Sequence, residues 1–213
     1  KFAMYEAIAR GVTLEKLHEI TKIDYFFLHK YLNLYNMECR LKEGNIDAET
    51  YLRAKKMGYP DKAIERLSGE KVPMHRDPVY KMVDTCAAEF AAETPYFYAT
   101  YDDENEAKEF LDERPKKPCV VVLGSGPIRI GQGIEFDYAS VHCVWMLKQA
   151  GYDVVMINNN PETVSTDFDT ADRLYFEPLT AEDVLGVIAT EKPVGVVAAV
   201  GGQTAIKLSH ALE

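Results

Sequence analysis

The fold of this chain is decided by the stretch Pro118-Cys-Val-Val-Val-Leu-Gly-Ser-Gly-Pro-Ile-Arg-Ile-Gly-Gln-Gly-Ile-Glu-Phe-Asp-Tyr138. A short run of β-branched residues leads into a glycine-rich turn, and a segment with helical spacing follows. This order is typical of the first strand, loop and helix of a parallel α/β sheet. Ligands of such sheets bind outside the carboxyl ends of the strands, so we expect a binding site at this turn.

The alternation of strands and helices continues from this stretch toward the C-terminal end. We predict strands at 119–123, 154–157, 172–176 and 195–200, with helices at 137–150, at about 180–190 and after 204. Four strands alternating with helices predict a parallel, Rossmann-like layer with right-handed crossovers.

Residues before this stretch have a different pattern. Between 2 and 68, short helical segments are separated by stop signals such as Gly11 and Gly44, and Thr13 and Asp24 are predicted N-caps. Short helices with brief connections predict a small all-helical domain. Residues 73–103 lack a clear period, so we interpret them as a partly buried, extended connector whose tyrosines pack between two domains.

A proline-bracketed segment predicts the domain boundary. Pro115 and Pro118 flank two lysines, and neither proline fits inside a helix or a central strand. We therefore predict a helical domain with its connector at 1–112 and an α/β domain at 113–213. The expected fold class is α + α/β. Because the chain opens with Lys1 inside a helical pattern, we expect it to be a piece of a longer polypeptide.

Composition excludes several classes of protein. The chain is 47% hydrophobic and 27% charged, and its apolar runs are far shorter than the roughly 20 residues of a membrane span. Residues 1–117 hold 19 basic and 22 acidic side chains, and residues 118–213 hold five and 12, which argues against nucleic-acid binding. The widely spaced cysteines predict free thiols in a reducing cytosol and no zinc or redox motif; they are Cys39, Cys86, Cys119 and Cys143.

The glycine-rich turn invites a dinucleotide-binding alternative. Its spacing does not fit, because Arg129 stands where the Rossmann fingerprint has glycine, and Asn158 and Asn159 stand where a ribose-binding acid would end the second strand. A Walker A loop is disfavoured because the turn has no Gly-Lys-Ser/Thr. Arg129 and Glu135 flank the turn, where they are placed either to contact a small anion or to pair with each other.

Polar loops follow three of the predicted strands, and parallel strands bring their carboxyl ends to one edge of the sheet. The loops are the turn at 124–133, the segment 158–163 and the segment 201–204. We therefore predict a ligand site at this edge. Besides the turn, its polar candidates are Asn160, Glu162, Thr163, Gly201, Gly202, Gln203 and Thr204.

Four strings, in this order and spacing, closely resemble the large chain of carbamoyl-phosphate synthases. They are the turn at 124–138, Asn-Pro-Glu-Thr-Val-Ser-Thr-Asp at 160–167, Asp-Arg-Leu-Tyr-Phe-Glu-Pro at 172–178 and Gly-Gly-Gln-Thr at 201–204. The segment 79–90 resembles the part of that chain just before its second synthetase half. In this family a helical oligomerisation domain separates two ATP-grasp halves. The resemblance implies that 1–112 is that domain and that the remainder is the pre-ATP-grasp layer of the second half.

The resemblance also implies a chemistry. Ammonia from glutamine attacks carboxyphosphate to give carbamate, and the second half phosphorylates carbamate with a further ATP, for arginine or pyrimidine synthesis. Arg129, Gly133 and Glu135 would line the arrival end of the carbamate passage, with Arg129 attracting the anion and Gly133 leaving room for it. The first half usually has Asn-Pro-Ala-Thr-Ile-Met-Thr-Asp at the second string, so the glutamate at 162 favours the second half.

Partners and cofactors follow from the same resemblance. ATP and Mg²⁺ would bind mainly outside this chain, which would hold no catalytic residue and be inactive alone. Expected partners are the rest of the large chain, a glutaminase small subunit and further copies of the helical domain, in the cytoplasm and without nucleic acid or membrane. Two alternatives remain from the residues: a non-catalytic self-association module and a dinucleotide-binding domain.

Overall fold

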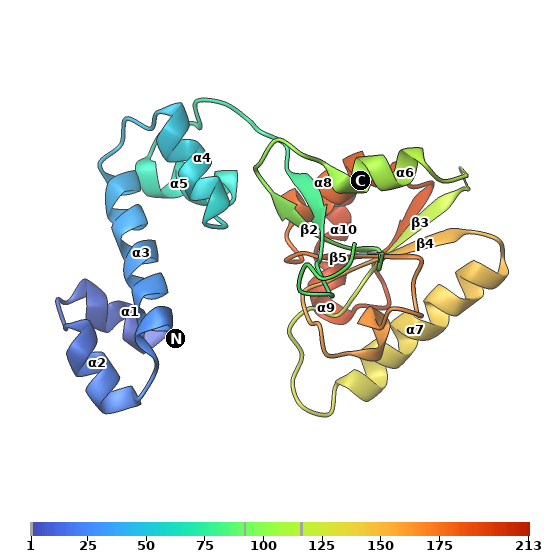
Figure 1. Cartoon of the computed structure of the whole chain (residues 1–213), viewed down its shortest axis with the longest axis horizontal. Helices are drawn as coiled ribbons and strands as arrows, with labels where there is room; N and C mark the ends of the chain where they lie inside the picture. The colour runs from blue at the N-terminus through green and yellow to red at the C-terminus, as the bar shows by residue number, and fades with distance from the viewer. Residues whose placement is uncertain (1, 92, 116) are drawn as a thin grey trace. The chain divides into compact units, whose positions relative to one another are not determined.

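The computed structural model describes residues 2–91, 93–115 and 117–213, so Lys1 and the Lys116 of the predicted linker lie outside the described residues. The chain divides into two compact units, residues 1–76 and residues 77–213 (Figure 1). Within the described part of the chain, no helix has the length and apolar character needed to cross a membrane.

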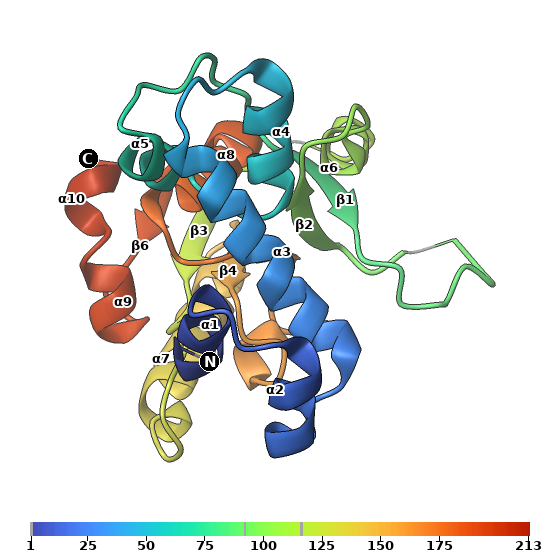
Figure 2. The ribbon, with the colours of Figure 1, turned by 90° about the vertical axis from the view of Figure 1, so that its left-hand side faces the viewer.

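The first unit is helical, with a long central helix that joins two small cores. Its helices are α1 (Phe2–Ala9), α2 (Leu14–Thr21), α3 (Tyr25–Lys42), α4 (Ala48–Lys56) and α5 (Asp61–Ser68). The predicted caps are confirmed, because the Thr13 side chain accepts from the Lys16 N–H and the Asp24 side chain accepts from the Phe26 N–H. Near its start, α3 packs with α1 and α2, and near its end with α4 and α5 (Figures 1 and 2).

The second unit is a sheet covered on both faces by helices. Within the described residues, six strands pair in the order β1-β2-β5-β4-β3-β6, and only β1 runs antiparallel to its neighbour. The strands are β1 (Val79–Met82), β2 (Tyr96–Thr100), β3 (Cys119–Leu123), β4 (Asp153–Asn158), β5 (Arg173–Phe176) and β6 (Gly195–Val197). The helices are α6 (Glu106–Asp112), α7 (Gly133–Gln149), η1 (Val164–Thr166), α8 (Ala181–Glu191), α9 (Gly202–Ile206) and α10 (Ser209–Leu212).

The central strands are buried on both faces of the sheet, which explains why their sequences are continuous apolar runs. All five residues of β3 are buried. Val121 and Leu123 belong to the core on the α8 side, whereas Val122 packs with Val144 of α7. Figure 2 shows β1, β2 and α6 at one edge of the sheet, and β6 with α9 and α10 at the other.

The segment predicted as a connector belongs to the sheet. It supplies β1 and β2, so the boundary between the compact units lies between Arg76 and Asp77 rather than between residues 112 and 113. Tyr80 and Phe97 are fully buried, with ring centroids 5.0 and 5.2 Å from that of Tyr175. Their strands are too short to show a period, and contacts distant in sequence hold them in place.

The tyrosine at the start of β2 also departs from the predicted interdomain packing. Tyr96 lies inside the second unit, with its ring centroid 5.5 Å from that of Phe176. Its hydroxyl donates to the Thr166 carbonyl oxygen at 3.0 Å. This residue therefore joins β2 to β5 and η1 within one unit.

The helix after the glycine-rich turn begins earlier than predicted. α7 starts at Gly133 rather than at Asp137, so Gly133 and Glu135 lie in its first turn and not in the loop. Asp137 is buried and accepts the Ser165 N–H at 3.2 Å, which ties η1 to α7. The last strand also ends earlier, at Val197 rather than at residue 200.

Candidate functional site at the carboxyl edge of the sheet

The strand order places a topological switch point beside β3. From β3 the chain passes to β4 and β5 on one side, and it later returns to β6 on the other side. In open parallel sheets, ligands bind in the crevice outside the carboxyl ends of the strands at such a point. The loop after β3 and the segment after β6 flank this switch point.

Direct contacts bring together the loops that follow β3, β4 and β6. The Gly126 N–H donates to Asn158 Oδ1 at 3.0 Å, and the Asn159 N–H donates to the same oxygen at 3.0 Å. Gly126 has a φ of +65°, and a Cβ there would lie 3.2 Å from Leu179 Cδ1 and 3.4 Å from Thr204 Cγ2. This loop therefore needs glycine for both its backbone conformation and its space.

The glycines at 201 and 202 serve the packing of the edge. A Cβ at Gly201 would lie 2.6 Å from the Leu123 carbonyl oxygen, and a Cβ at Gly202 would lie 2.9 Å from Phe136 Cε1. Real Cβ atoms essentially never lie so close, so at Gly201 the segment after β6 approaches the end of β3 backbone to backbone, and at Gly202 it packs against the Phe136 ring. These two predicted site residues shape the crevice through their lack of a side chain.

Two polar groups in the predicted loops at 124–133 and 158–163 are buried, which the sequence does not predict. Among the described side chains, Ser125 Oγ and Asn158 Nδ2 are buried without a hydrogen-bond partner. Buried polar groups nearly always have a hydrogen-bond partner in folded proteins. These two therefore mark a place where the described residues supply no such partner. The sequence carries one signal for them, since Ser125 is the first polar side chain after β3 and Asn158 is the last residue of β4, each directly beyond a buried apolar run.

Arg129 and Glu135 are exposed on either side of the start of α7. The Arg129 N–H donates to Gln132 Oε1 at 2.8 Å, which closes the turn before the helix. Within residues 117–213, no ion pair joins the Arg129 and Glu135 side chains, so the alternative of mutual pairing is not realised in the structure. A Cβ at Gly133 would meet only Ile128 Cδ1, at 3.7 Å.

The loop after β4 is ordered by its own hydrogen bonds. Asn160 Oδ1 accepts the Glu162 N–H at 3.1 Å, and the Asn160 carbonyl oxygen accepts the Thr166 hydroxyl at 3.1 Å. Thr163 Oγ1 lies 3.1 Å from Ser165 Oγ. These bonds use Asn160 and Thr163 to build the loop, and they leave the exposed Glu162 carboxylate at its surface.

A buried carboxyl group follows β5. Glu177 accepts the Ala99 N–H from β2 and is only 5% exposed. Burial raises its pKa to about 7, the hydrogen bond from Ala99 opposes the rise, and the charge of Asp183 adds to it. Since the folded pKa is above the ordinary 4.5, stability present at low pH is lost as pH rises through about 7.

Glu177→Gln should therefore stabilise the second unit at alkaline pH. We expect equal unfolding free energies at pH 4.5 and an advantage of about 2 kcal/mol for the glutamine variant at pH 8, because the amide keeps an acceptor for Ala99 without a buried charge. Urea unfolding followed by fluorescence of Trp145, the single tryptophan, measures this. Glu113→Gln, at an exposed position, is the control. An advantage that does not change with pH would contradict the assignment.

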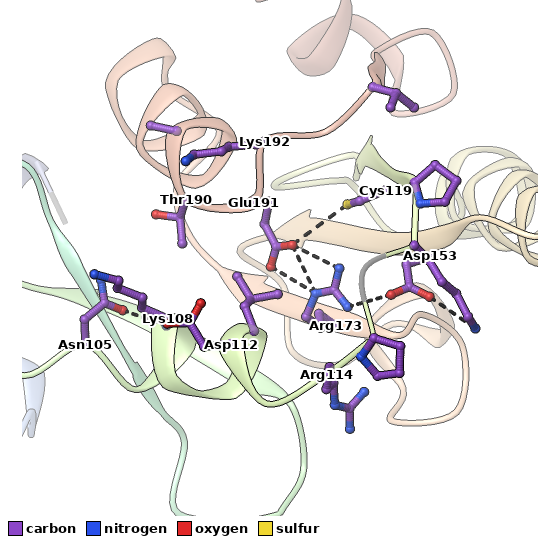
Figure 3. A pocket seen from close by; sticks show the side chains of 16 residues that line it. Asn105, Lys108, Asp112, Arg114, Cys119, Asp153, Arg173, Thr190, Glu191 and Lys192 are labelled. Atoms are coloured by element: carbon purple, nitrogen blue, oxygen red, sulfur yellow. Dashed lines mark hydrogen bonds and ion pairs between the residues drawn. The ribbon is translucent and has the colours of Figure 1, made fainter.

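A cavity of about 630 Å³ lies at the opposite, amino-terminal edge of the sheet and is called the amino-edge cavity below. It is lined by the first residues of β3, β4 and β5, by α6 and the segment after it, and by the end of α8. Arg173 lies between Glu191 and Asp153 (Figure 3), with its Nη2 3.0 Å from Glu191 Oε2 and its Nη1 3.3 Å from Asp153 Oδ2. Tyr175 donates to Glu191 Oε1 at 2.7 Å.

A buried ion pair between Arg173 and Glu191 is the centre of this amino-edge network. The side chains of Arg173 and Glu191 are 3% and 0% exposed. Burial acts to lower the pKa of Arg173, but the charge of Glu191 outweighs it and raises that pKa above its ordinary value. The guanidinium is therefore permanently charged and serves the structure. No local sequence pattern predicts this cluster, because its members come together only through the strand order.

Family models match both parts of the chain. A model described as "Carbamoyl-phosphate synthetase large chain, oligomerisation domain" matches residues 1–82. A model described as "Carbamoyl phosphate synthase preATP-grasp domain" matches residues 116–213. The first match covers the whole helical unit and extends through β1, and the second covers the sheet from β3 onward. Both descriptions name the same synthase, and the first names its large chain, in agreement with the resemblance of the sequence strings. This chain therefore belongs to the carbamoyl-phosphate synthase large chain family.

Proposed function

We propose that this chain is an internal part of the large subunit of a glutamine-dependent carbamoyl-phosphate synthase. In this proposal it provides self-association and the carbamate-accepting edge of the second, carbamate-phosphorylating half. One observation carries the proposal: an oligomerisation domain precedes a pre-ATP-grasp domain whose turn at 124–133 adjoins the switch point of the sheet. The glutamate at 162 favours the second half over the first.

The carboxyl edge suits the handling of a small anion. The Arg129 side chain is exposed and has no ion-pair partner within residues 117–213, so its charge is available to attract carbamate. Gly133 has open space where another residue would carry a side chain, which suits a passage. Glu135, with Glu162, would limit how long an anion stays near Arg129, because carboxylates repel it.

The remaining polar candidates would shape the crevice at the switch point and would take no part in a chemical step. Asn160 and Thr163 hold the loop after β4, and Thr204 packs against Gly126. Gln203 is exposed at the start of α9 and is free to contact a polar ligand. We propose no catalytic residue among them. Each contributes to the geometry of the crevice at the switch point.

ATP and Mg²⁺ would be held mainly by other parts of the subunit. Within the described residues, no group of three or more His, Cys, Asp or Glu side chains is placed to hold a metal ion. The turn at 124–133 also has no lysine to contact a phosphate chain. In the parent enzyme the nucleotide would supply the phosphoryl group, while this chain would guide and position the anion.

Self-association is supported by apolar side chains on the helical unit. Phe2, Ile20, Phe26 and Phe27 are all more than half exposed. Contiguous exposed apolar patches mark surfaces that bind other proteins, and the Phe26 and Phe27 rings adjoin each other with centroids 5.3 Å apart. We propose that further copies of the helical domain cover them, and that the glutaminase subunit binds elsewhere on the large subunit.

A complementation experiment tests the proposal and separates it from a non-catalytic association module. Alone, the chain should release no ADP in the presence of bicarbonate and ATP. Added to a large subunit that lacks residues 118–213, it should restore synthesis of carbamoyl phosphate. Restored oligomer size without restored synthesis would favour the association module, and bicarbonate-dependent turnover by the chain alone would refute the proposed division of labour.

A further inference from the structure

The second unit is strongly acidic, but its amino-edge cavity is positive. Residues 77–213 contain ten Lys and Arg against 23 Asp and Glu, a balance of −13. Five of these ten cations line the cavity, with three of the 23 carboxylates, which gives a local balance of +2. A concave surface with an excess of one sign of charge concentrates ions of the opposite sign. The five cations are Lys108, Arg114, Lys117, Arg173 and Lys192.

Three of the five cations form no ion pair with the carboxylates that the structure describes. Arg173 is paired with Glu191 and Asp153, and Lys117 lies 3.7 Å from Asp153 Oδ1. In the part of the chain that the structure describes, no ion pair joins the side chains of the other three to a carboxylate. These cations are Lys108, Arg114 and Lys192, and Figure 3 shows them around the Arg173 pair.

Each of these cations emerges from a fixed part of the backbone. Lys108 lies on α6, and Arg114 follows its end with the guanidinium carbon 4.0 Å from the Phe110 ring centroid. Lys192 is the C-cap of α8 and has a φ of 50°, a conformation that favours glycine over lysine. The cavity therefore has cations on two sides, from α6 with the segment after it and from the end of α8.

The rest of the wall is mixed: Asn105, Thr190 and the carboxylate of Asp112 line it together with apolar side chains, and the volume suits a small molecule. Leu111, Pro118 and Val194 line the cavity beside the cations. Its volume of about 630 Å³ falls within the range of small-molecule sites, about 300–1,000 Å³. A ligand that matches both features has a charged end and an apolar body. A dianion would balance the local charge of +2.

We propose that the amino-edge cavity binds a small organic dianion, of the phosphate monoester class, through Lys108, Arg114 and Lys192. The apolar body of the ligand would lie against Leu111 and Val194. The cavity opens at the amino ends of the parallel strands, whereas the crevice proposed for carbamate lies at their carboxyl ends. The proposal is therefore independent of the carbamate route and adds a second ligand site to the same unit.

Titration with phenyl phosphate, followed by amide chemical shifts in nuclear magnetic resonance, tests this site on the 213-residue chain. We expect saturable shifts confined to residues 108–114 and 189–194. Arg114→Gln and Lys192→Gln should each raise the dissociation constant about tenfold, the effect of losing one charge-assisted hydrogen bond. Benzyl alcohol, which has the apolar body without the charge, should not bind measurably.

Lys207→Gln is the matched control, because it removes one positive charge from an exposed position outside the cavity. It should leave the dissociation constant unchanged. Equal weakening by Lys207→Gln, shifts spread over the whole unit, or no saturable binding would each overturn the proposal. Trp145 fluorescence during urea unfolding verifies that the variants are folded, and Lys192→Arg, which keeps the charge, should retain binding if Lys192→Gln loses it.

Discussion

Arg173→Met should lower the unfolding free energy of the second unit by about 3–5 kcal/mol, the cost of leaving a buried charge without its partner. Glu191 would keep a side chain that is 0% exposed and would lose the guanidinium that holds both of its oxygens. Domains are stable by only about 5–15 kcal/mol, so the loss is a large share of the total. Urea unfolding followed by Trp145 fluorescence measures it.

A second substitution separates the buried charge from the lost packing. In Arg173→Met with Glu191→Gln, the amide is neutral and still accepts a hydrogen bond from Tyr175, so we expect the double variant to recover at least half of the loss. Lys81→Met, which breaks an ion pair with the largely exposed Glu104, should change little. A double variant no more stable than Arg173→Met alone would show that packing, not charge, causes the effect.

The elements that the sequence predicts well are those whose signals are local. Thr13 and Asp24 cap α2 and α3 with their own side chains, and this chemistry acts over two or three residues. The strands β3 and β4 are buried on both faces, so each forms an unbroken apolar run. The fold class and the order of strands and helices from β3 to α9 follow from such patterns.

Elements held by distant contacts could not be predicted in the same way. β1 and β2 have four and five residues, and their identity depends on Tyr80 and Phe97 packing on Tyr175. The sequence predicts a start at Asp137 for α7, later than the observed start at Gly133, because glycine is a poor helix former in isolation. In both cases tertiary contacts decide the structure, and a single stretch of sequence does not contain them.

The two edges of the sheet also differ in how far their contacts can be predicted from the sequence, because some contacts follow from the strand pattern and others depend on tertiary packing. Parallel strands bring their carboxyl ends together, so the meeting of the loops after β3, β4 and β6 follows from the strand pattern alone. The Asn158 side chain, which joins the loops after β3 and β4, and the unpaired Ser125 hydroxyl depend on packing distances. At the amino edge, Arg173 meets Glu191 only because β5 and the end of α8 lie close together. Position in the fold, and not any motif, creates that cluster.

Gly133→Leu, introduced into the complete synthase, should reduce carbamoyl phosphate formation about tenfold or more, which is about 1.4 kcal/mol or more in the barrier. In the proposed function, bicarbonate-dependent ATP hydrolysis belongs to the first half, so it should remain within about twofold of its original rate. The substitution should not disturb the fold, because a Cβ at Gly133 has only Ile128 Cδ1 nearby, at 3.7 Å, and the rest of the leucine can extend away from the chain.

Gly195→Leu is the matched control, since a Cβ at Gly195 would also have open space around it and this residue lies on β6, away from the turn. Both rates are measured with ammonium chloride as the nitrogen source, so that the glutaminase reaction does not contribute. If the leucine side chain at position 133 obstructs the carbamate route, the first half continues to consume ATP while its product fails to reach the second. Equal loss of both activities, or the same loss from the control, would place the effect in folding or assembly and reject the role of Gly133 in the passage.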